Sequence, residues 1–210
     1  MKSPYIFTHI APKETGEKPA IFLLHGLGSN EQDLLQLVGN MPFDCHIFSL
    51  RGPITHPPGY AFYTFEEEGL PNQDVFDQVV QFTKQFIEEA VVEFSLKKEA
   101  LYVMGFNQGA ALVQALTVIM GNTLHGAVVL SGFVPQFVVE EYCKLPLGNV
   151  KMFIAHGEYD YVYPLAWGKA SAEFFEEYGA QITFKTYADG HGVTAEELND
   201  LMAWFSEVSK

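Results

Sequence analysis

The pentapeptide Gly105-Phe106-Asn107-Gln108-Gly109 has the residue types and spacing that most clearly suggest chemistry in this chain. A short apolar run, residues 101–104, precedes it, and an apolar run typical of a helix, residues 110–116, follows it. This context predicts a strand, a sharp turn and a helix, with the central side chain held above the helix N-terminus. Glycines fit both sides of such a turn because strand and helix approach too closely for a Cβ. The pattern is that of a nucleophile elbow with Asn107 at its centre.

Asn107 stands where the chemistry of such an elbow calls for a serine. A carboxamide nitrogen is a poor nucleophile, and it offers a general base no hydroxyl to deprotonate. In a serine protease, loss of the nucleophile lowers kcat by roughly 10⁶, and the oxyanion hole and substrate binding still supply roughly 10³–10⁴ over water. Asn tolerates unusual backbone angles better than most residues, so the turn itself is expected to survive.

Two later residues complete a candidate triad in the chain order nucleophile, acid, histidine. Asp160 follows a predicted strand, and it is expected to orient His191 and to stabilise its charged form. His191 lies in a Gly-His-Gly loop and is the candidate general base. Two backbone N–H groups, those of Gln108 and Leu27, are expected to bind the oxyanion that develops on a carbonyl substrate.

Strands alternate with helices along most of the chain, which predicts an α/β fold with a doubly wound, mainly parallel sheet and helices on both faces. In such sheets ligands bind beyond the carboxyl ends of the strands, where the candidate residues lie. Apolar runs mark the strands, and apolar residues at helical spacing mark the helices. The expected strands are 5–10, 20–24, 45–50, 101–104, 125–131, 150–155 and 181–187, and the expected helices are 31–40, 73–94, 110–120, 165–178 and 194–208.

Capping residues mark the start of two of these helices. Ser29 or Asn30 is expected to cap the first helix, and Thr194 with Glu197 forms a capping box at the start of the last.

No lid domain is visible between the strands. A chain of 210 residues is therefore expected to be a single domain spanning residues 1–210.

Residues 51–71 form a long irregular stretch rich in proline and glycine. Loops of this length inside a compact domain are usually functional. We expect aromatic side chains of this stretch, together with an aromatic side chain next to Asp160, to line a substrate pocket. For the aromatic residues within 51–71, packing of the loop itself is the alternative explanation. The candidates are Tyr60, Phe62, Tyr63, Phe65 and Tyr161.

Composition narrows the range of partners. The net charge of −14 argues against nucleic acid or an anionic membrane surface as a partner. Residues 1–5 hold no apolar segment of a secretory signal, and no run reaches the ~18 apolar residues of a membrane span. Cys45 and Cys143, far apart in sequence, are more typical of free cytosolic thiols than of a bridge. A cytoplasmic protein without an integral membrane segment is expected.

No metal site and no cofactor are expected. Spacings such as H-E-x-x-H do not occur in the sequence. His25 and His156 each end a strand directly before a glycine, and they are expected to shape loops instead of binding metal.

Together these motifs resemble those of the phospholipase/carboxylesterase family of α/β-hydrolases, which includes the acyl-protein thioesterases. The resemblance covers nearly the whole chain and departs from the family pattern at Asn107, where Ser is usual, and at Tyr161, where Pro or another small residue is common. The matching motifs are His25-Gly26-Leu27-Gly28, Arg51-Gly52-Pro53, residues 105–109, Leu130-Ser131-Gly132-Phe133, His156-Gly157-Glu158-x-Asp160-x-Val162-x-Pro164 and Gly190-His191.

This resemblance implies an α/β-hydrolase fold and hydrolysis of small-molecule carboxylic esters or thioesters through an acyl-serine. It also implies that no metal is needed, and it allows a homodimer. Four explanations of Asn107 remain open at this point. The chain is an ester hydrolase changed at one position, or a natural pseudoenzyme that binds an acyl or small hydrophobic ligand. Alternatively, Asn107 deamidates to an aspartyl nucleophile, or His191 and Asp160 activate water directly.

Overall fold

The computed structural model describes residues 5–67 and 70–209. Residues 1–4, on which the expectation about a secretory signal partly depends, lie outside this range, as does Gly69 of the irregular stretch.

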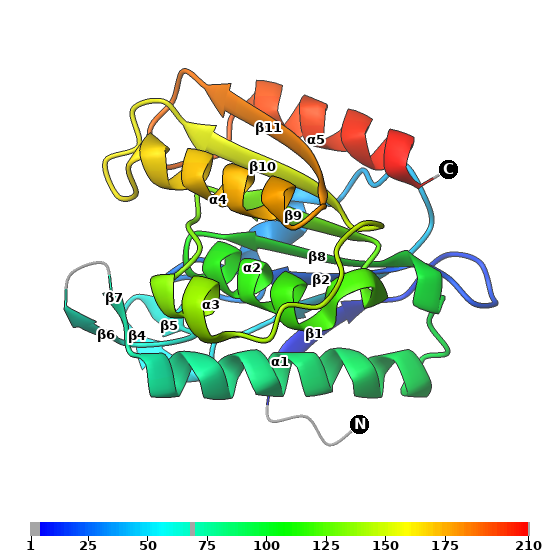
Figure 1. Ribbon diagram of the computed structural model, residues 1–210. Helices are drawn as coiled ribbons and strands as arrows, with labels where there is room; N and C mark the ends of the chain where they lie inside the picture. The colour runs from blue at the N-terminus through cyan, green and yellow to red at the C-terminus, as the bar shows by residue number, and fades with distance from the viewer. Residues whose placement is uncertain (1–4, 68–69, 210) are drawn as a thin grey trace.

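A seven-stranded sheet forms the centre of the molecule, with strand order β1-β3-β2-β8-β9-β10-β11 (Figure 1). β1 at one edge is antiparallel to β3, and every other neighbouring pair in this sheet is parallel. The strands are β1 (Phe7–Ile10), β2 (Ala20–Leu24), β3 (His46–Leu50), β8 (Leu101–Phe106), β9 (Gly126–Leu130), β10 (Lys151–Gly157) and β11 (Gln181–Tyr187).

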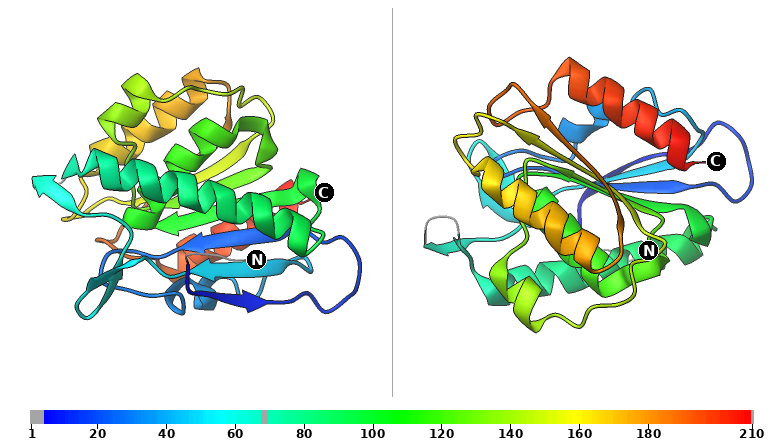
Figure 2. Two further views of the ribbon diagram at one scale, coloured as in Figure 1. Left: turned by 90° about the horizontal axis from the view of Figure 1, so that it is seen from below. Right: turned by 45° about the horizontal axis from the view of Figure 1, so that its top comes forward.

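Helices cover both faces of this sheet, as Figure 2 shows. One face carries α1 (Gln73–Glu93), α2 (Gln108–Met120), α3 (Gln136–Glu141) and α4 (Leu165–Glu177), and the other carries α5 (Ala195–Val208) and the 3₁₀ helix η1 (Asp33–Leu37). Two further 3₁₀ turns are η2 (Lys98–Ala100) and η3 (Gly121–Thr123). The predicted α/β-hydrolase fold, with its mainly parallel sheet between two helical layers, is confirmed.

The central strands are apolar throughout because both of their faces are covered. In β2, for example, Phe22 packs toward α1 and α2, and Ile21 and Leu23 pack toward α5 and η1. All five residues of β2 are buried. This continuous burial forces the strand into the middle of the sheet and places its carboxyl end beside that of β8.

The predicted helix over residues 31–40 is wrong in type and length. The structure has the short 3₁₀ helix η1 there, and its N-cap residue, Gln32, makes no side-chain capping bond. The two expected caps are used differently: Asn30 Oδ1 accepts from the N–H of Gln32 at 2.9 Å, and Ser29 Oγ donates to the Asp33 carboxylate at 2.7 Å. These local bonds tighten the chain into 3₁₀ turns in place of an α-helical start.

The stretch over residues 51–71 is more regular than expected. It contains two small antiparallel pairs, β4 (Ile54–His56) with β5 (Gly59–Ala61), and β6 (Phe65–Glu67) with β7 (Leu70–Pro71). The short helix α3, which begins directly after Pro135, is a further element that sequence reasoning did not predict.

Candidate active site

Asn107 lies in the sharp turn between β8 and α2, with φ of 53° and ψ of −114°. Both flanking glycines are required sterically, because a Cβ at Gly105 would overlap the backbone of Gly109, and a Cβ at Gly109 would overlap the carbonyl oxygen of Leu24. The N–H of Asn107 donates to the carbonyl of Leu130 in β9 at 3.1 Å. The turn therefore holds the Asn107 side chain at the carboxyl ends of β8 and its neighbours.

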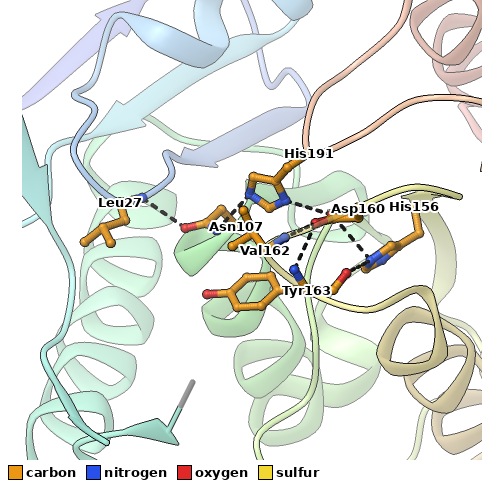
Figure 3. Close-up of polar contacts among 7 residues, drawn as sticks. All are labelled: Leu27, Asn107, His156, Asp160, Val162, Tyr163 and His191. Carbon is orange, nitrogen blue, oxygen red and sulfur yellow. Dashed lines mark hydrogen bonds and ion pairs between the residues drawn. The ribbon is translucent and has the colours of Figure 1, made fainter. Parts of the chain in front are cut away.

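A continuous line of hydrogen bonds passes through this side chain (Figure 3). The backbone N–H of Leu27 donates to Asn107 Oδ1 at 3.1 Å. Asn107 Nδ2 lies 2.9 Å from His191 Nε2, and His191 Nδ1 lies 2.7 Å from Asp160 Oδ2. These four residues come from loops that follow β2, β8, β11 and β10, so the sheet brings together groups that lie up to 164 positions apart in the chain.

The direction of each proton in this line follows from the first bond. A backbone N–H can only donate, so the Asn107 oxygen faces Leu27 and its NH₂ group faces His191. His191 Nε2 must then accept, which places the ring proton on Nδ1, where it is donated to Asp160. This is the tautomer that leaves Nε2 free to act as a base toward a group at position 107.

Asp160 is held as a carboxylate by the groups around it. Its Oδ1 accepts from the backbone N–H groups of Val162 at 2.8 Å and of Tyr163 at 2.9 Å, and its side chain is fully buried. Burial acts to raise the pKa of Asp160, but the hydrogen bond from His191 and the two backbone N–H groups outweigh it, so the pKa lies below its ordinary value. Asp160 is therefore ionised at neutral pH and orients the imidazole.

Two further histidines tie loops together near the site. His25 Nε2 accepts from the N–H of Gly52 at 2.9 Å, and burial lowers the pKa of His25, which keeps the ring neutral. His156 Nε2 donates to the carbonyl of Tyr163 at 2.8 Å and lies 3.5 Å from Asp160 Oδ2. His25 thus ties the end of β2 to the loop after β3, and His156 ties the end of β10 to the loop that follows it, as expected for loop-shaping residues.

The side chains of Gln108 and Tyr60 make contacts that the sequence did not predict. The Gln108 side chain is fully buried, where it donates to the carbonyl of Tyr63 at 2.8 Å and accepts from the N–H of Phe62 at 3.0 Å. Tyr60 packs its ring under the Arg51 guanidinium, and its backbone carbonyl accepts from the N–H of Gly28 at 2.8 Å. Both residues brace the loops around Asn107, and the Gln108 N–H remains a predicted oxyanion donor.

The other expected substrate contacts are not gathered around Asn107. Phe62 and Tyr63 are fully buried in the core against α1, where Tyr63 packs on Phe76. Phe65 is half-buried and packs edge-on against Tyr63. Tyr161 is 86% exposed. The packing explanation for the aromatic cluster therefore accounts for Phe62 and Tyr63.

Tyr163 is the aromatic residue that the structure places beside Asn107, and sequence reasoning missed it. It is only 5% exposed, its ring centroid lies 5.6 Å from that of His191, and its hydroxyl interacts with the Asn107 side chain. The sequence signal was its place between Asp160 and Pro164. A loop has no periodicity, so the sequence did not show which of Tyr161 and Tyr163 points inward.

Within residues 5–67 and 70–209, no group of three or more His, Cys, Asp or Glu side chains is placed to hold a metal ion. In the same ranges, none of the helices combines the length and the apolar character needed to cross a membrane.

Comparisons with known proteins place this geometry in a family. A sequence model described as Phospholipase/Carboxylesterase matches residues 7–209. Acyl-protein thioesterase 1 of Candida albicans is 31% identical over 91% of this chain and 92% of its own length. The putative hydrolase MhqD of Bacillus subtilis is 28% identical over 95% of this chain and 98% of its own length.

Solved structures share the fold. The carboxylesterase of Bacillus cereus superposes with a TM-score of 0.89, over 99% of this chain and 96% of that chain, at 24% sequence identity. The SOBER1 structure of Arabidopsis thaliana superposes with a TM-score of 0.76, over 92% of this chain and all of that chain, at 21% identity. The family match spans both the elbow and the His191 loop, and the chain belongs to the phospholipase/carboxylesterase family of α/β-hydrolases.

Proposed function

We propose that this chain carries the site of a carboxylic ester hydrolase, built as a nucleophile-Asp160-His191 triad, in which Asn107 occupies the position of the nucleophile and silences or strongly impairs the reaction. The observation that carries the proposal is the line of hydrogen bonds from the Leu27 N–H through Asn107 and His191 to Asp160. Substrates of the carboxylesterase, lysophospholipase or thioesterase type fit such a site.

With a serine at position 107, each group in this line has a defined task. His191 Nε2 takes the hydroxyl proton as the oxygen attacks the ester carbonyl, and Asp160 stabilises the imidazolium that forms. The N–H groups of Leu27 and Gln108 donate to the oxygen of the tetrahedral intermediate. His191 then gives the proton to the leaving group, and a water molecule repeats the sequence to release the acid.

Asn107 blocks this sequence in two ways. Its NH₂ group donates a hydrogen bond to His191 Nε2, which occupies the lone pair of the base. Removing a proton from this amide does not produce a useful nucleophile. Its Oδ1 accepts from the Leu27 N–H, so the donor meant for the substrate carbonyl is already used. The same contact to Nε2 disfavours direct activation of water by His191, because a water molecule would have to displace the amide.

The experiment that tests the proposal compares hydrolysis of p-nitrophenyl butyrate by the unaltered chain, Asn107→Ser and Asn107→Ala. We expect Asn107→Ser to gain several decades in kcat, up to about 10⁶, and the matched Asn107→Ala variant to gain nothing, since it frees the base without supplying a nucleophile. Peptide mass spectrometry on the unaltered chain verifies that residue 107 is still an amide, because an Asp there would introduce aspartyl chemistry.

If Asn107→Ser and the unaltered chain are equally inactive, the ester hydrolase interpretation of this pocket is refuted. If the unaltered chain already hydrolyses the ester at the rate of Asn107→Ser, then position 107 is not the nucleophile position.

The second candidate function is a non-catalytic protein that uses the same site to bind an acyl or small hydrophobic ligand. The observation that favours it is the state of Asn107, which is 7% exposed and hydrogen-bonded at both ends of its amide. Equal inactivity of the three proteins, together with measurable binding of a fatty acid, is the result that supports this candidate.

Three further expectations accompany the proposal: a single domain over residues 1–210, a cytoplasmic location, and a chain that pairs as a homodimer without binding nucleic acid. Light scattering of the purified protein tests the dimer.

A further inference from the structure

Tyr163 lies on a side of the Asn107 amide that no other part of the hydrogen-bonded line uses. Leu27 faces the amide oxygen and His191 faces the amide nitrogen. In Figure 3 the ring of Tyr163 lies beside Asn107, and its centroid is 5.6 Å from that of His191 in an edge-on contact. Its hydroxyl interacts with the Asn107 side chain, and burial raises the pKa of Tyr163 to about 12, so the phenol is neutral at physiological pH.

The stereochemistry of acyl transfer indicates which part of a substrate would lie near Tyr163. The acyl carbon that reacts at position 107 carries the attacking atom, the oxyanion, the leaving group and the acyl chain. The oxyanion must point to the Leu27 N–H, and the leaving group must face His191, which protonates it. The acyl chain takes the remaining direction, past the ring of Tyr163, which contacts both the Asn107 side chain and the His191 ring.

Tyr163 is held there by a cluster of aromatic neighbours. Its ring stacks on Trp167 at 5.7 Å between centroids and meets Phe133 edge-on at 4.9 Å. Its backbone is tied as well, because its N–H donates to Asp160 and its carbonyl accepts from His156. A ring held by this many contacts does not move aside without losing packing and hydrogen bonds.

Buried side chains lie near the Tyr163 ring. The hydroxyl of Tyr63, which interacts electrostatically with Tyr163, is buried and has no hydrogen-bond partner among the described residues. The Tyr63 ring packs on the buried Phe76. An alkyl chain that reached this hydroxyl could not offer it a hydrogen bond, so a long acyl chain gains little by entering here.

We propose that Tyr163 is the specificity-determining residue of this site and that it restricts the acyl group to short chains such as acetyl and butyryl. This inference rests on the proposed function and narrows its substrates: of the types named there, it selects esters or thioesters of short acids and excludes those with long-chain acyl groups, such as lysophospholipids.

The test uses the Asn107→Ser background, in which the site is expected to be active, with p-nitrophenyl acetate and p-nitrophenyl octanoate as substrates. Three proteins are compared: the background itself, the background with Tyr163→Val, and the background with Tyr159→Val. Tyr159 is a matched control because it is a tyrosine of the same loop but 71% exposed. The readout is the ratio of kcat/KM for octanoate to that for acetate, which a purely structural role of Tyr163 would not change.

We expect the background to prefer acetate by at least about tenfold, since even one methylene in a packed pocket is worth roughly 10–200-fold. Tyr163→Val is expected to move the ratio toward octanoate by at least about tenfold, and Tyr159→Val to leave it within about threefold. Tyr163→Phe keeps the ring and is expected to keep the preference for acetate, and it serves as the second variant if Tyr163→Val does not fold.

Equal use of acetate and octanoate by the background overturns the inference. An unchanged ratio in a folded Tyr163→Val protein overturns it as well, although the proposed function would then stand. If the background hydrolyses neither ester, the proposed function fails. The inference is then tested separately by isothermal titration calorimetry, which measures octanoate binding to the unaltered chain and to Tyr163→Val. Binding to Tyr163→Val but not to the unaltered chain supports it, and equal binding or no binding to both refutes it.

Discussion

Glu197 is a buried carboxyl group whose ionisation is coupled to the stability of the fold. It is the third residue of α5 and only 2% exposed, and its own N–H donates to Thr194 Oγ1 at 3.0 Å. Burial raises the pKa of Glu197 to about 7; the Thr194 backbone N–H opposes this rise, and the nearby charge of Asp189 adds to it. We predict that Glu197→Gln stabilises the protein at pH 8.

The sign and size follow from proton binding. The folded state holds a proton up to about pH 7, whereas the unfolded chain releases it near the ordinary value of 4.5. The contribution of this group to stability is therefore full below pH 4.5 and is lost as the pH rises to about 7. At about 1.4 kcal/mol for each pH unit, the interval corresponds to about 3 kcal/mol of unfolding free energy. Gln cannot ionise, so the variant avoids this loss.

The assay is thermal unfolding of both proteins at pH 5 and pH 8. A difference of about 3 kcal/mol corresponds to about 6–12 °C in Tm for a chain of this length, and the gain of Glu197→Gln is expected at pH 8 but to be small at pH 5. Glu196→Gln, at the exposed neighbouring position, is the control and is expected to show no pH-dependent gain. A gain for Glu197→Gln that is the same at both pH values would refute the reasoning, because an uncharged effect of the amide would explain it.

Two shorter predictions concern the site and the turn that carries it. In the Asn107→Ser background, Asp160→Asn is expected to lower kcat by about 10⁴, because the imidazole loses the partner that sets its tautomer; a drop below tenfold in p-nitrophenyl acetate hydrolysis would contradict this role. Gly109→Ala is expected to destabilise the protein by about 3 kcal/mol or more, because the added Cβ overlaps the Leu24 carbonyl. Gly148→Ala, where a Cβ meets nothing within 4 Å, is its control, and equal unfolding midpoints in urea for the two variants would show that the overlap is relieved at no cost.

Several features could be predicted from the sequence because they depend on local patterns. Continuous apolar runs such as residues 20–24 occur where a strand is covered on both faces, and they correctly placed the inner strands. Thr194 caps α5 as expected, since its side chain reaches only three residues along the chain. The strand–turn–helix context of Asn107 was predictable for the same reason, because Gly105 approaches the backbone of Gly109 only four residues along the chain.

Other features were decided by side-chain hydrogen bonds, either between distant segments or within a loop. Phe62 and Tyr63 lie in a loop whose composition suggested a pocket. The Gln108 side chain, which accepts from the Phe62 N–H and donates to the Tyr63 carbonyl, helps to hold this loop against the core. The helix expected over residues 31–40 shrinks to η1 because local side-chain bonds compete with helical ones. Neither outcome is visible in hydrophobic periodicity.

The identities of Asn107, Asp160 and His191 and their order were contained in the sequence, together with membership of the family. Their distances, the direction of the proton on His191, and the choice of Tyr163 over Tyr161 as the inward-facing ring were decided only in the folded chain. The physical reason is that each of these depends on where separate loops end in space. A parallel sheet sets those positions by bringing the carboxyl ends of its strands to one edge.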